Sequence, residues 1–403
     1  MRKRQLILIG VIAVISSFFS FSPDCHLSFA KDNDHILTID HPVDHISTVP
    51  ANYEDPVILF VRERVSKGLI QGNGKIGVNG KVVLFVHGGT APAVAVYDLP
   101  FEDYSWAEFL AKAGFDVFMM DLTGYGFSPR PEMDDPCNAN PDQQDLLIPN
   151  PLSCECEASY PFNLNTRQSE WDEINTVVDY ILDLRGVERV NLIGWSAGGP
   201  RIGGYAALYP DKVNKLYFYA GSGSRTESSD PPDQVPADGF PMNLQSYGRL
   251  MDERWGANVH CPDQVNYEIQ PVVWNTIMSF DTLGSTWGDP PWNLISTPTG
   301  GVMRTRTATS WGWNADTEAL IKAPSLLIAG EFDMSAGRIY LYEDLGSDSK
   351  VFIEVACASH FLVWENQHNV LLETSKEWFL HGSIRGIKNG MLTYDADGKF
   401  HKK

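Results

Sequence analysis

Residues 191–200 read NLIGWSAGGP, and this stretch decides the fold. An apolar run ends at Ser196, which stands between Gly194 and Gly198. Because glycine has no Cβ, glycines at these two positions let a buried strand turn sharply into a helix. Pro200 suits the first turn of that helix, where a missing N–H costs nothing. The stretch therefore predicts a strand, a tight turn that exposes the Ser196 hydroxyl, and a helix whose amino end favours negative charge.

Six short apolar runs have the character of strands that are buried on both faces. They cover residues 82–86, 116–122, 189–195, 215–221, 325–333 and 350–356. Stretches with apolar residues at helical spacing lie between them, among them 105–113 and 169–184. This alternation is typical of a doubly wound, mostly parallel sheet with helices on both faces. We therefore expect a single α/β domain over residues 31–403.

Two stretches interrupt the alternation. Residues 128–167 hold Pro, Asn, Asp and three cysteines without sustained periodicity, so we expect a long excursion loop there. Residues 225–316 are rich in Pro and Gly yet contain six of the eleven tryptophans. Such rings can pack an irregular insertion together, or they can line an apolar pocket beneath a cap. We interpret 225–316 as a cap insertion in which most rings pack and a few line a pocket. Residues 392–400 predict a terminal hairpin with an Asp-Gly turn.

Three motifs resemble those of the α/β-hydrolase superfamily. Residues 194–198 (GWSAG) are similar to its G-x-S-x-G nucleophile elbow, and residues 87–90 (HGGT) to its oxyanion turn. Residues 121–128 (DLTGYGFS) are similar to its Asp-x-x-Gly-x-Gly-x-Ser turn. The sequence HGGT departs from the HGGG and HGGPG of two subfamilies, and the excursion at 128–167 is long. The resemblance therefore implies the superfamily and leaves the subfamily open.

The resemblance also implies a catalytic triad in the chain order serine, acid, histidine. Ser196 is the nucleophile, Asp333 at the end of one predicted strand is the acid, and His360 after the next strand is the base. A serine hydroxyl needs such a base, and the base needs an orienting acid. Glu331 is the alternative acid, although its side chain would alternate onto a different face of the strand end.

Further site residues follow from the same resemblance. The oxyanion hole would use the backbone N–H groups of Gly89 and Ala197, with Thr90 beside them. We interpret His87, Asp121 and Ser128 as structural residues that brace the turns. Substrate-binding candidates are Thr90, Trp195, Trp274, Trp287 and Trp311. No metal or cofactor is expected.

The first thirty residues have the features of a cleaved secretory signal. They begin MRKR, continue through an apolar run at 6–21, and end in SFA, a small-x-small cleavage pattern. A membrane anchor is the alternative, but the run is shorter than the roughly 20 residues that span a bilayer. No other run is long enough. We expect a secreted or periplasmic protein.

Charge narrows the range of partners. Without residues 1–30 the chain has 28 basic and 50 acidic residues, a net charge of about −22. Nucleic acids and anionic membrane surfaces both require basic patches, so we exclude them as partners. The acidity itself is typical of a chain that must stay soluble outside the cell.

Five cysteines remain after residue 30: Cys137, Cys154, Cys156, Cys261 and Cys357. The odd number leaves at least one thiol free or paired between chains. In an oxidising compartment we expect Cys137 to bridge either Cys154 or Cys156, which would hold the polar excursion together. The Cys154-Glu155-Cys156 spacing lacks the two-residue gap of a zinc site.

The sequence therefore predicts an exported serine hydrolase that cleaves small carboxylic esters of apolar or aromatic acyl groups through an acyl-enzyme. The same triad serves C–C, peptide and peroxyacid chemistry in other members of the superfamily, and these reactions are the alternatives. A third hypothesis is a non-catalytic binding protein on a hydrolase scaffold. Dehalogenases and epoxide hydrolases of this superfamily use an aspartate nucleophile, so Ser196 argues against both. The oligomeric state is left open.

Overall fold

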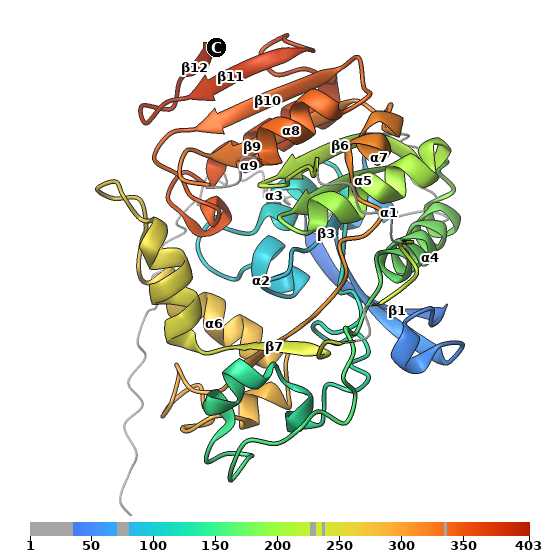
Figure 1. Cartoon of the computed structure of the whole chain (residues 1–403). Helices are drawn as coiled ribbons and strands as arrows, with labels where there is room; N and C mark the ends of the chain where they lie inside the picture. Colours follow the sequence, from blue (N-terminus) through green and yellow to red (C-terminus); the bar gives the residue numbers. More distant parts are fainter. Residues whose placement is uncertain (1–34, 71–79, 226–230, 236–237, 334–336) are drawn as a thin grey trace, which may run out of the picture.

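The computed structural model describes residues 35–70, 80–225, 231–235, 238–333 and 337–403. In this part of the chain a ten-stranded sheet forms the centre of the molecule, in the order β1-β2-β4-β3-β5-β6-β9-β10-β11-β12 (Figure 1). The strands are β1 (Ile36–Ile46), β2 (Pro56–Ser66), β3 (Val82–Val86), β4 (Asp116–Met120), β5 (Val190–Trp195), β6 (Val213–Tyr219), β9 (Ser325–Gly330), β10 (Lys350–Val355), β11 (Gly390–Tyr394) and β12 (Phe400–Lys402).

The six predicted strands form the parallel centre of this sheet, which confirms the predicted fold class. They are buried because both faces of the sheet are covered, and successive side chains enter opposite cores. In β3, for example, Val83 and Phe85 pack into one apolar core, while Val82, Leu84 and Val86 pack into the other. Strands of this kind appear in a sequence as unbroken apolar runs.

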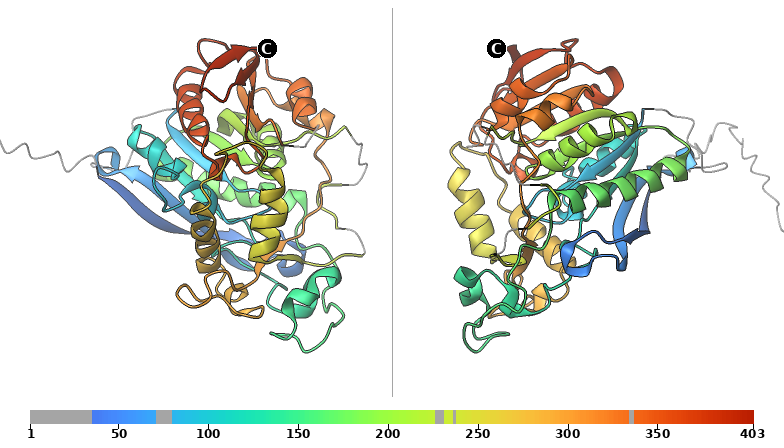
Figure 2. Two further views of the ribbon diagram at one scale, coloured as in Figure 1. Left: turned by 90° about the vertical axis from the view of Figure 1, so that its left-hand side faces the viewer. Right: turned by 45° about the vertical axis from the view of Figure 1, so that its right-hand side comes forward.

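Helices cover both faces of the sheet. The first core packs against α3 (Trp106–Lys112) and α9 (Asn369–His381). The second packs against α4 (Arg167–Arg185), α5 (Gly198–Leu208) and α8 (Gly337–Asp344). The right-hand view of Figure 2 shows α4 and α5, in green, in front of the sheet. The described residues also form the helices α1 (Lys67–Ile70), α2 (Ala93–Tyr97), α6 (Ile269–Ser279) and α7 (Ala315–Leu320).

The strand order reverses at β3, and this reversal positions the predicted site. β3 pairs with β4 on one side and with β5 on the other, both in parallel. Loops at such a switch point lie side by side at the carboxyl ends of the strands, where α/β proteins bind ligands. Val86 pairs with Gly194, so the turn that follows β3 lies beside the turn that follows β5.

Two hairpins extend the sheet at its edges. The hairpin of β1 and β2 is antiparallel and joins β4, and the sequence did not predict it. The predicted terminal hairpin is present: β12 pairs antiparallel with β11, and Gly398 has the positive φ of +78° that its turn requires. β11 also pairs in parallel with β10, so this hairpin is part of the main sheet.

The two insertions pack against each other, at the opposite end of the molecule from β11 and β12 (Figure 1). Apolar residues of 128–167 and 225–316 share a small core that includes Leu147, Leu164, Leu244 and Trp287. Within the second insertion, β7 (Met242–Gln245) and β8 (Met303–Arg306) form a two-stranded sheet. The excursion and the cap, expected as separate interruptions, thus form one layer over the carboxyl ends of the strands.

The predicted secretory signal, residues 1–30, lies outside the described residues. Among the residues that are described, none of the helices combines the length and the apolar character needed to cross a bilayer. The disulfide between Cys137 and Cys156 is one of the two pairings that the sequence predicted for the excursion. Cys154 is a free, exposed thiol.

Candidate active site

Ser196 stands on the sharp turn between β5 and α5. Its φ of +54° is unusual for a residue with a side chain, and two flanking glycines make the turn possible. A Cβ on Gly194 would lie 2.4 Å from the Gly198 carbonyl oxygen, and one on Gly198 would lie 2.5 Å from that of Val86. The turn therefore tolerates no side chain at either position, as its sequence predicted.

Asp333 and His360 lie on neighbouring loops at the same edge of the sheet. β9 and β10 pair with Gly330 opposite Val355, so the loops that follow them are adjacent. His360 Nδ1 lies 3.2 Å from Asp333 Oδ1. The Asp333 side chain is 5% exposed and that of His360 is 24% exposed, so the acid is buried and the imidazole is open to solvent. In this arrangement the buried carboxylate can orient the partly exposed imidazole.

Glu331, the alternative acid, has a different partner. Its side chain is exposed, and its carboxylate accepts a hydrogen bond from the Cys357 backbone N–H at 3.0 Å. Asp333 contacts the imidazole of His360, whereas within the described residues no hydrogen bond joins Glu331 to that ring. The geometry favours Asp333 as the orienting acid.

Aromatic residues hold the loop that carries His360. The His360 carbonyl oxygen accepts hydrogen bonds from the indole N–H of Trp195, at 3.1 Å, and from the hydroxyl of Tyr219, at 2.8 Å. Trp195 is fully buried, and its ring centroid lies 5.6 Å from that of His360. Trp195, proposed from the sequence as a substrate-binding residue, thus lies beneath the histidine loop, without an exposed face.

The cap is tied to the same loop by a buried carboxylate and by a disulfide. Glu365 accepts hydrogen bonds from the Ser359 N–H at 2.9 Å, from Gln264 at 3.0 Å and from the indole of Trp255 at 3.3 Å. Burial raises the pKa of Glu365. The disulfide between Cys261 and Cys357 joins the cap to the chain three residues before His360. The sequence did not assign this pairing.

The turn after β3 is held by hydrogen bonds to the Gly88 carbonyl. His87 Nε2 accepts a hydrogen bond from the Leu122 N–H at 3.1 Å, so its proton is on Nδ1, which donates to Gly88 O at 2.7 Å. Arg201 Nη1 also donates to Gly88 O, at 3.0 Å, and to His87 O, at 2.6 Å. Burial and the Arg201 charge lower the pKa of His87 far below its ordinary value, so it is neutral. His87 therefore has the structural role that the sequence predicted.

These bonds orient the Gly89 N–H. In a planar trans peptide the C=O of Gly88 and the N–H of Gly89 point in opposite directions, so fixing one fixes the other. The Tyr125 hydroxyl holds the following peptide by donating to Gly89 O at 2.8 Å. A Cβ on Gly88 would lie 3.1 Å from Ser196 Cβ, and one on Gly89 would lie 3.9 Å from Ala197 Cβ. The turn after β3 is thus in contact with the nucleophile turn.

Two backbone amides beside Ser196 are unpaired. Within the described residues, neither the Gly89 N–H nor the Ala197 N–H has a hydrogen-bond partner. Unpaired amides that are held rigidly next to a nucleophile can receive an oxyanion without reorganisation. Ala197 precedes the first residue of α5, where the helix dipole adds to the attraction for negative charge.

Asp121 and Ser128 brace the segment next to this turn. Asp121 Oδ1 accepts the Ala93 N–H at 2.7 Å, at the start of α2, and burial raises the pKa of Asp121 to about 6. The Ser128 hydroxyl donates to the Asp121 carbonyl and accepts the Phe60 N–H at 2.9 Å. Thr90, the last residue of the oxyanion turn and a proposed substrate-binding residue, is 2% exposed.

The three cap tryptophans proposed as substrate-binding residues differ in exposure. Trp274 is fully buried and donates to Gly300 O at 2.8 Å. Trp287 is 3% exposed and packs in the small core between the insertions, with the Arg304 guanidinium 5.0 Å from its ring centroid. Trp311 is half-buried. Of these rings, Trp311 presents the largest exposed surface.

A cluster of buried charges lies behind the oxyanion turn, and no pattern in the sequence indicated it. Glu170 on α4 forms ion pairs with Arg167, with Arg201 at 2.8 Å and with Arg306 at 2.5 Å. Glu173, one turn later, is fully buried, and this burial raises its pKa to about 7. Three guanidinium groups thus surround one firmly ionised carboxylate, which leaves an excess of positive charge behind the turn.

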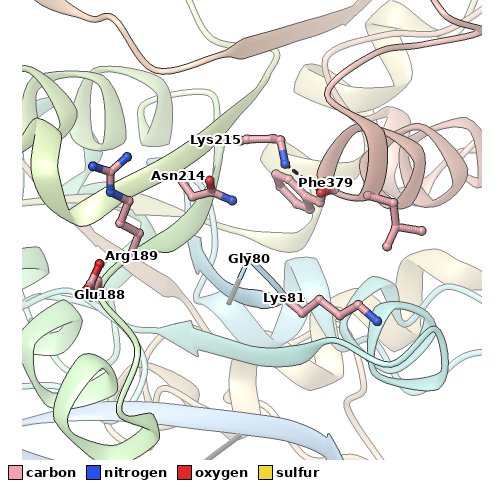
Figure 3. A pocket seen from close by; sticks show the side chains of 8 residues that line it. Gly80, Lys81, Glu188, Arg189, Asn214, Lys215 and Phe379 are labelled. Carbon is pink, nitrogen blue, oxygen red and sulfur yellow. Dashed lines mark hydrogen bonds between the residues drawn. The ribbon is translucent and has the colours of Figure 1, made fainter. Parts of the chain in front are cut away.

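Other features of the described residues do not add to the site. No group of three or more His, Cys, Asp or Glu side chains in these ranges is arranged to hold a metal ion. A pocket of about 430 Å³ lined by Lys81, Arg189 and Lys215 lies at the amino ends of β3, β5 and β6 (Figure 3). Ser196, Asp333 and His360 all follow the carboxyl ends of strands, so this pocket lies at the other edge of the sheet.

Comparison with known proteins identifies the family. The profile of the α/β hydrolase fold family matches residues 81–367, more than half of the chain. The chain therefore belongs to this family, and the resemblance inferred from its motifs is confirmed. No curated protein sequence matches the chain.

Solved structures of similar fold include a thermophilic esterase from Thermogutta terrifontis, with 15% identity and a TM-score of 0.46 over 87% of this chain and 100% of that one. Another is a serine hydrolase involved in carbazole degradation, with 13% identity and a TM-score of 0.48 over 84% of this chain and 99% of that one. At these values the likeness concerns the fold alone.

Proposed function

We propose that the protein is a serine hydrolase that cleaves carboxylic esters with Ser196, His360 and Asp333. The observation that carries the proposal is the pairing of His360 Nδ1 with Asp333 Oδ1, at 3.2 Å, on the edge of the sheet where the Ser196 turn and two unpaired amides lie. A serine on a strained turn, an acid-oriented imidazole and rigid amide donors are the parts that acyl transfer requires.

In the proposed reaction Ser196 Oγ attacks the ester carbonyl carbon while His360 Nε2 takes the hydroxyl proton. The carbonyl oxygen becomes an oxyanion, to which Gly89 and Ala197 donate their N–H groups. Asp333 stabilises the imidazolium that forms. The imidazolium then protonates the departing alcohol, which leaves an acyl group on Ser196. Water, deprotonated by His360, attacks this acyl-enzyme and releases the acid.

Two further properties belong to the proposal. Export is supported by the two disulfides, because such bonds persist in oxidising compartments. A preference for apolar or aromatic acyl groups rests on the cap, where Trp311 is partly exposed while Trp274 and Trp287 are buried.

The test is active-site labelling combined with turnover. A fluorophosphonate probe should label the wild-type protein and should not label Ser196→Ala, and mass spectrometry should place the adduct on Ser196. Nitrophenyl esters from acetyl to dodecanoyl should be hydrolysed by the wild type only. A folded wild-type protein that is neither labelled nor active on any ester would refute the proposal.

A further inference from the structure

A pocket of about 380 Å³ opens beside the oxyanion turn. Gly89, which carries one of the two unpaired amides, forms part of its wall. The π-helical stretch η6 (Arg249–Trp255) of the cap contributes Arg249 and Arg254 to the lining of the same pocket. A substrate whose carbonyl oxygen is bound at Gly89 therefore has these two guanidinium groups within reach of its remaining atoms.

Arg254 has no acidic partner among the described residues. Its Nη1 donates to the amide oxygen of Gln245 at 2.9 Å, and its Nη2 lies 3.5 Å from the Thr90 hydroxyl. Both acceptors are neutral. Thr90 follows Gly89 directly, so the Arg254 charge lies next to the oxyanion turn. An arginine without a carboxylate keeps its full capacity to bind an anion.

Arg249 has only a weak acidic partner among the described residues. Its nearest carboxylate oxygen, on Asp145, is 3.7 Å away, and the Asp145 side chain is 66% exposed, so water screens the pair. Glu253 also borders the pocket and forms no ion pair with Arg249 or Arg254 within the described residues. The excess positive charge around Glu170 lies behind the same wall, because Arg306 borders the pocket as well. This is a positive site in a chain with a net charge of −20.

We infer that this pocket is an anion subsite, and that the preferred substrates are esters that also carry a carboxylate. Arg254, with Arg249 beside it, would bind that group while the ester carbonyl is held at the oxyanion turn. The inference rests on the proposed ester hydrolysis and names its substrate class. It is compatible with an apolar or aromatic acyl group, because the charge can be at the far end of the acyl chain or on the alcohol.

The test compares esters that differ only in charge. On the acyl side, 4-nitrophenyl hexanoate is paired with the mono-4-nitrophenyl ester of adipic acid. On the alcohol side, phenyl acetate is paired with 3-acetoxybenzoate. We expect the wild type to have the higher kcat/KM for the charged member of at least one pair. In Arg254→Gln the ratio of charged to neutral kcat/KM should fall by roughly tenfold, the value of one charge-assisted hydrogen bond. Arg254→Lys should retain part of the ratio.

Two controls make the outcome specific. Arg189→Gln removes an exposed positive charge at the other edge of the sheet and should leave the ratio unchanged. Added salt should lower the wild-type ratio, because it screens an exposed charge pair. If both pairs are hydrolysed but neither ratio responds to Arg254→Gln, the subsite is refuted while ester hydrolysis stands. If no ester is hydrolysed and Ser196 is not labelled, the proposed function itself fails.

Discussion

Arg201 Nη1 lies 3.0 Å from the carbonyl oxygen of Gly88, and this contact joins the helix after Ser196 to the turn after β3. The backbone of Arg201 belongs to α5, which begins directly after Ala197. One residue therefore sets the position of one proposed oxyanion donor relative to the other. The Gly88–Gly89 peptide needs such a constraint, because glycine on both sides makes rotation of a peptide plane easy.

Replacing this arginine should slow the chemical step. In Arg201→Met the Gly88 carbonyl keeps only the His87 donor, so one hydrogen bond instead of two orients the Gly89 N–H. We expect kcat to fall by about 10²-fold, near the effect of losing one oxyanion donor, with little change in KM. Arg201→Lys should recover part of kcat.

Thermal melting must be measured in parallel, because Arg201→Met also leaves Glu170 with fewer partners. Binding of a boronic-acid transition-state analogue should weaken along with kcat. A variant that melts earlier but retains the wild-type kcat would show that Arg201 supports the fold and does not position the amide.

The acid of the proposed triad can be identified by two isosteric substitutions. Asp333→Asn should lower kcat by several orders of magnitude, because an amide holds the wrong tautomer of His360. Glu331→Gln should be nearly neutral, because its partner is the Cys357 backbone. His360→Ala and Ser196→Ala should each be as severe as their double mutant. Active Asp333→Asn with inactive Glu331→Gln would assign the acid to Glu331.

Glu173 should make stability depend on pH. Burial raises its pKa from 4.5 to about 7, so the folded state holds the proton more tightly than the unfolded state does. As pH rises from about 4.5 to 7, Glu173 ionises in the unfolded chain but stays protonated in the folded protein. The free energy of unfolding therefore falls by up to about 3 kcal/mol over this range. Glu173→Gln removes this loss.

Urea denaturation at pH 5 and pH 8 measures the effect. The variant should gain stability relative to the wild type between the two pH values, while the exposed control Glu188→Gln should not. A gain for Glu173→Gln that is the same at both pH values would contradict the assignment.

The parts of the structure that the sequence predicted depend on local patterns. Strands buried on both faces form unbroken apolar runs, and the nucleophile turn requires glycines that a sequence displays directly. Strand β1 was not predicted, because polar residues alternate along it and Pro42 interrupts it. The ion pair of Glu170 with Arg306 joins positions 136 residues apart, and no spacing rule relates them. The joint core of the two insertions was missed for the same reason, since neither insertion has a periodic pattern of its own.

The two disulfides should differ in what they control. Cys137–Cys156 lies within the excursion, so Cys137→Ser with Cys156→Ser should make 128–167 sensitive to proteolysis while most ester turnover remains. Cys261–Cys357 joins the cap to the loop of His360 across 96 residues, a cross-link worth about 4–5 kcal/mol in stability. Cys261→Ser with Cys357→Ser should lower both the melting temperature and kcat. Equal effects of both pairs on kcat would contradict this assignment.

In the oxidised wild type, an alkylating reagent should modify Cys154 first, because its thiol is free and exposed.

The cap tryptophans should divide into packing rings and substrate-contacting rings. Trp274 and Trp287 are buried in cores, so replacing either with alanine should cost about 3–5 kcal/mol of stability and affect all esters alike. Trp311 is partly exposed, and a ring that contacts an acyl chain contributes about 1–3 kcal/mol to the selectivity for that chain. Trp311→Ala should therefore lower kcat/KM for hexanoyl or benzoyl esters far more than for acetyl esters, with a small change in melting temperature. If the ratio of hexanoyl to acetyl turnover is unchanged in all three variants, acyl selectivity lies elsewhere, and residues 90–97 after the oxyanion turn become the segment to examine.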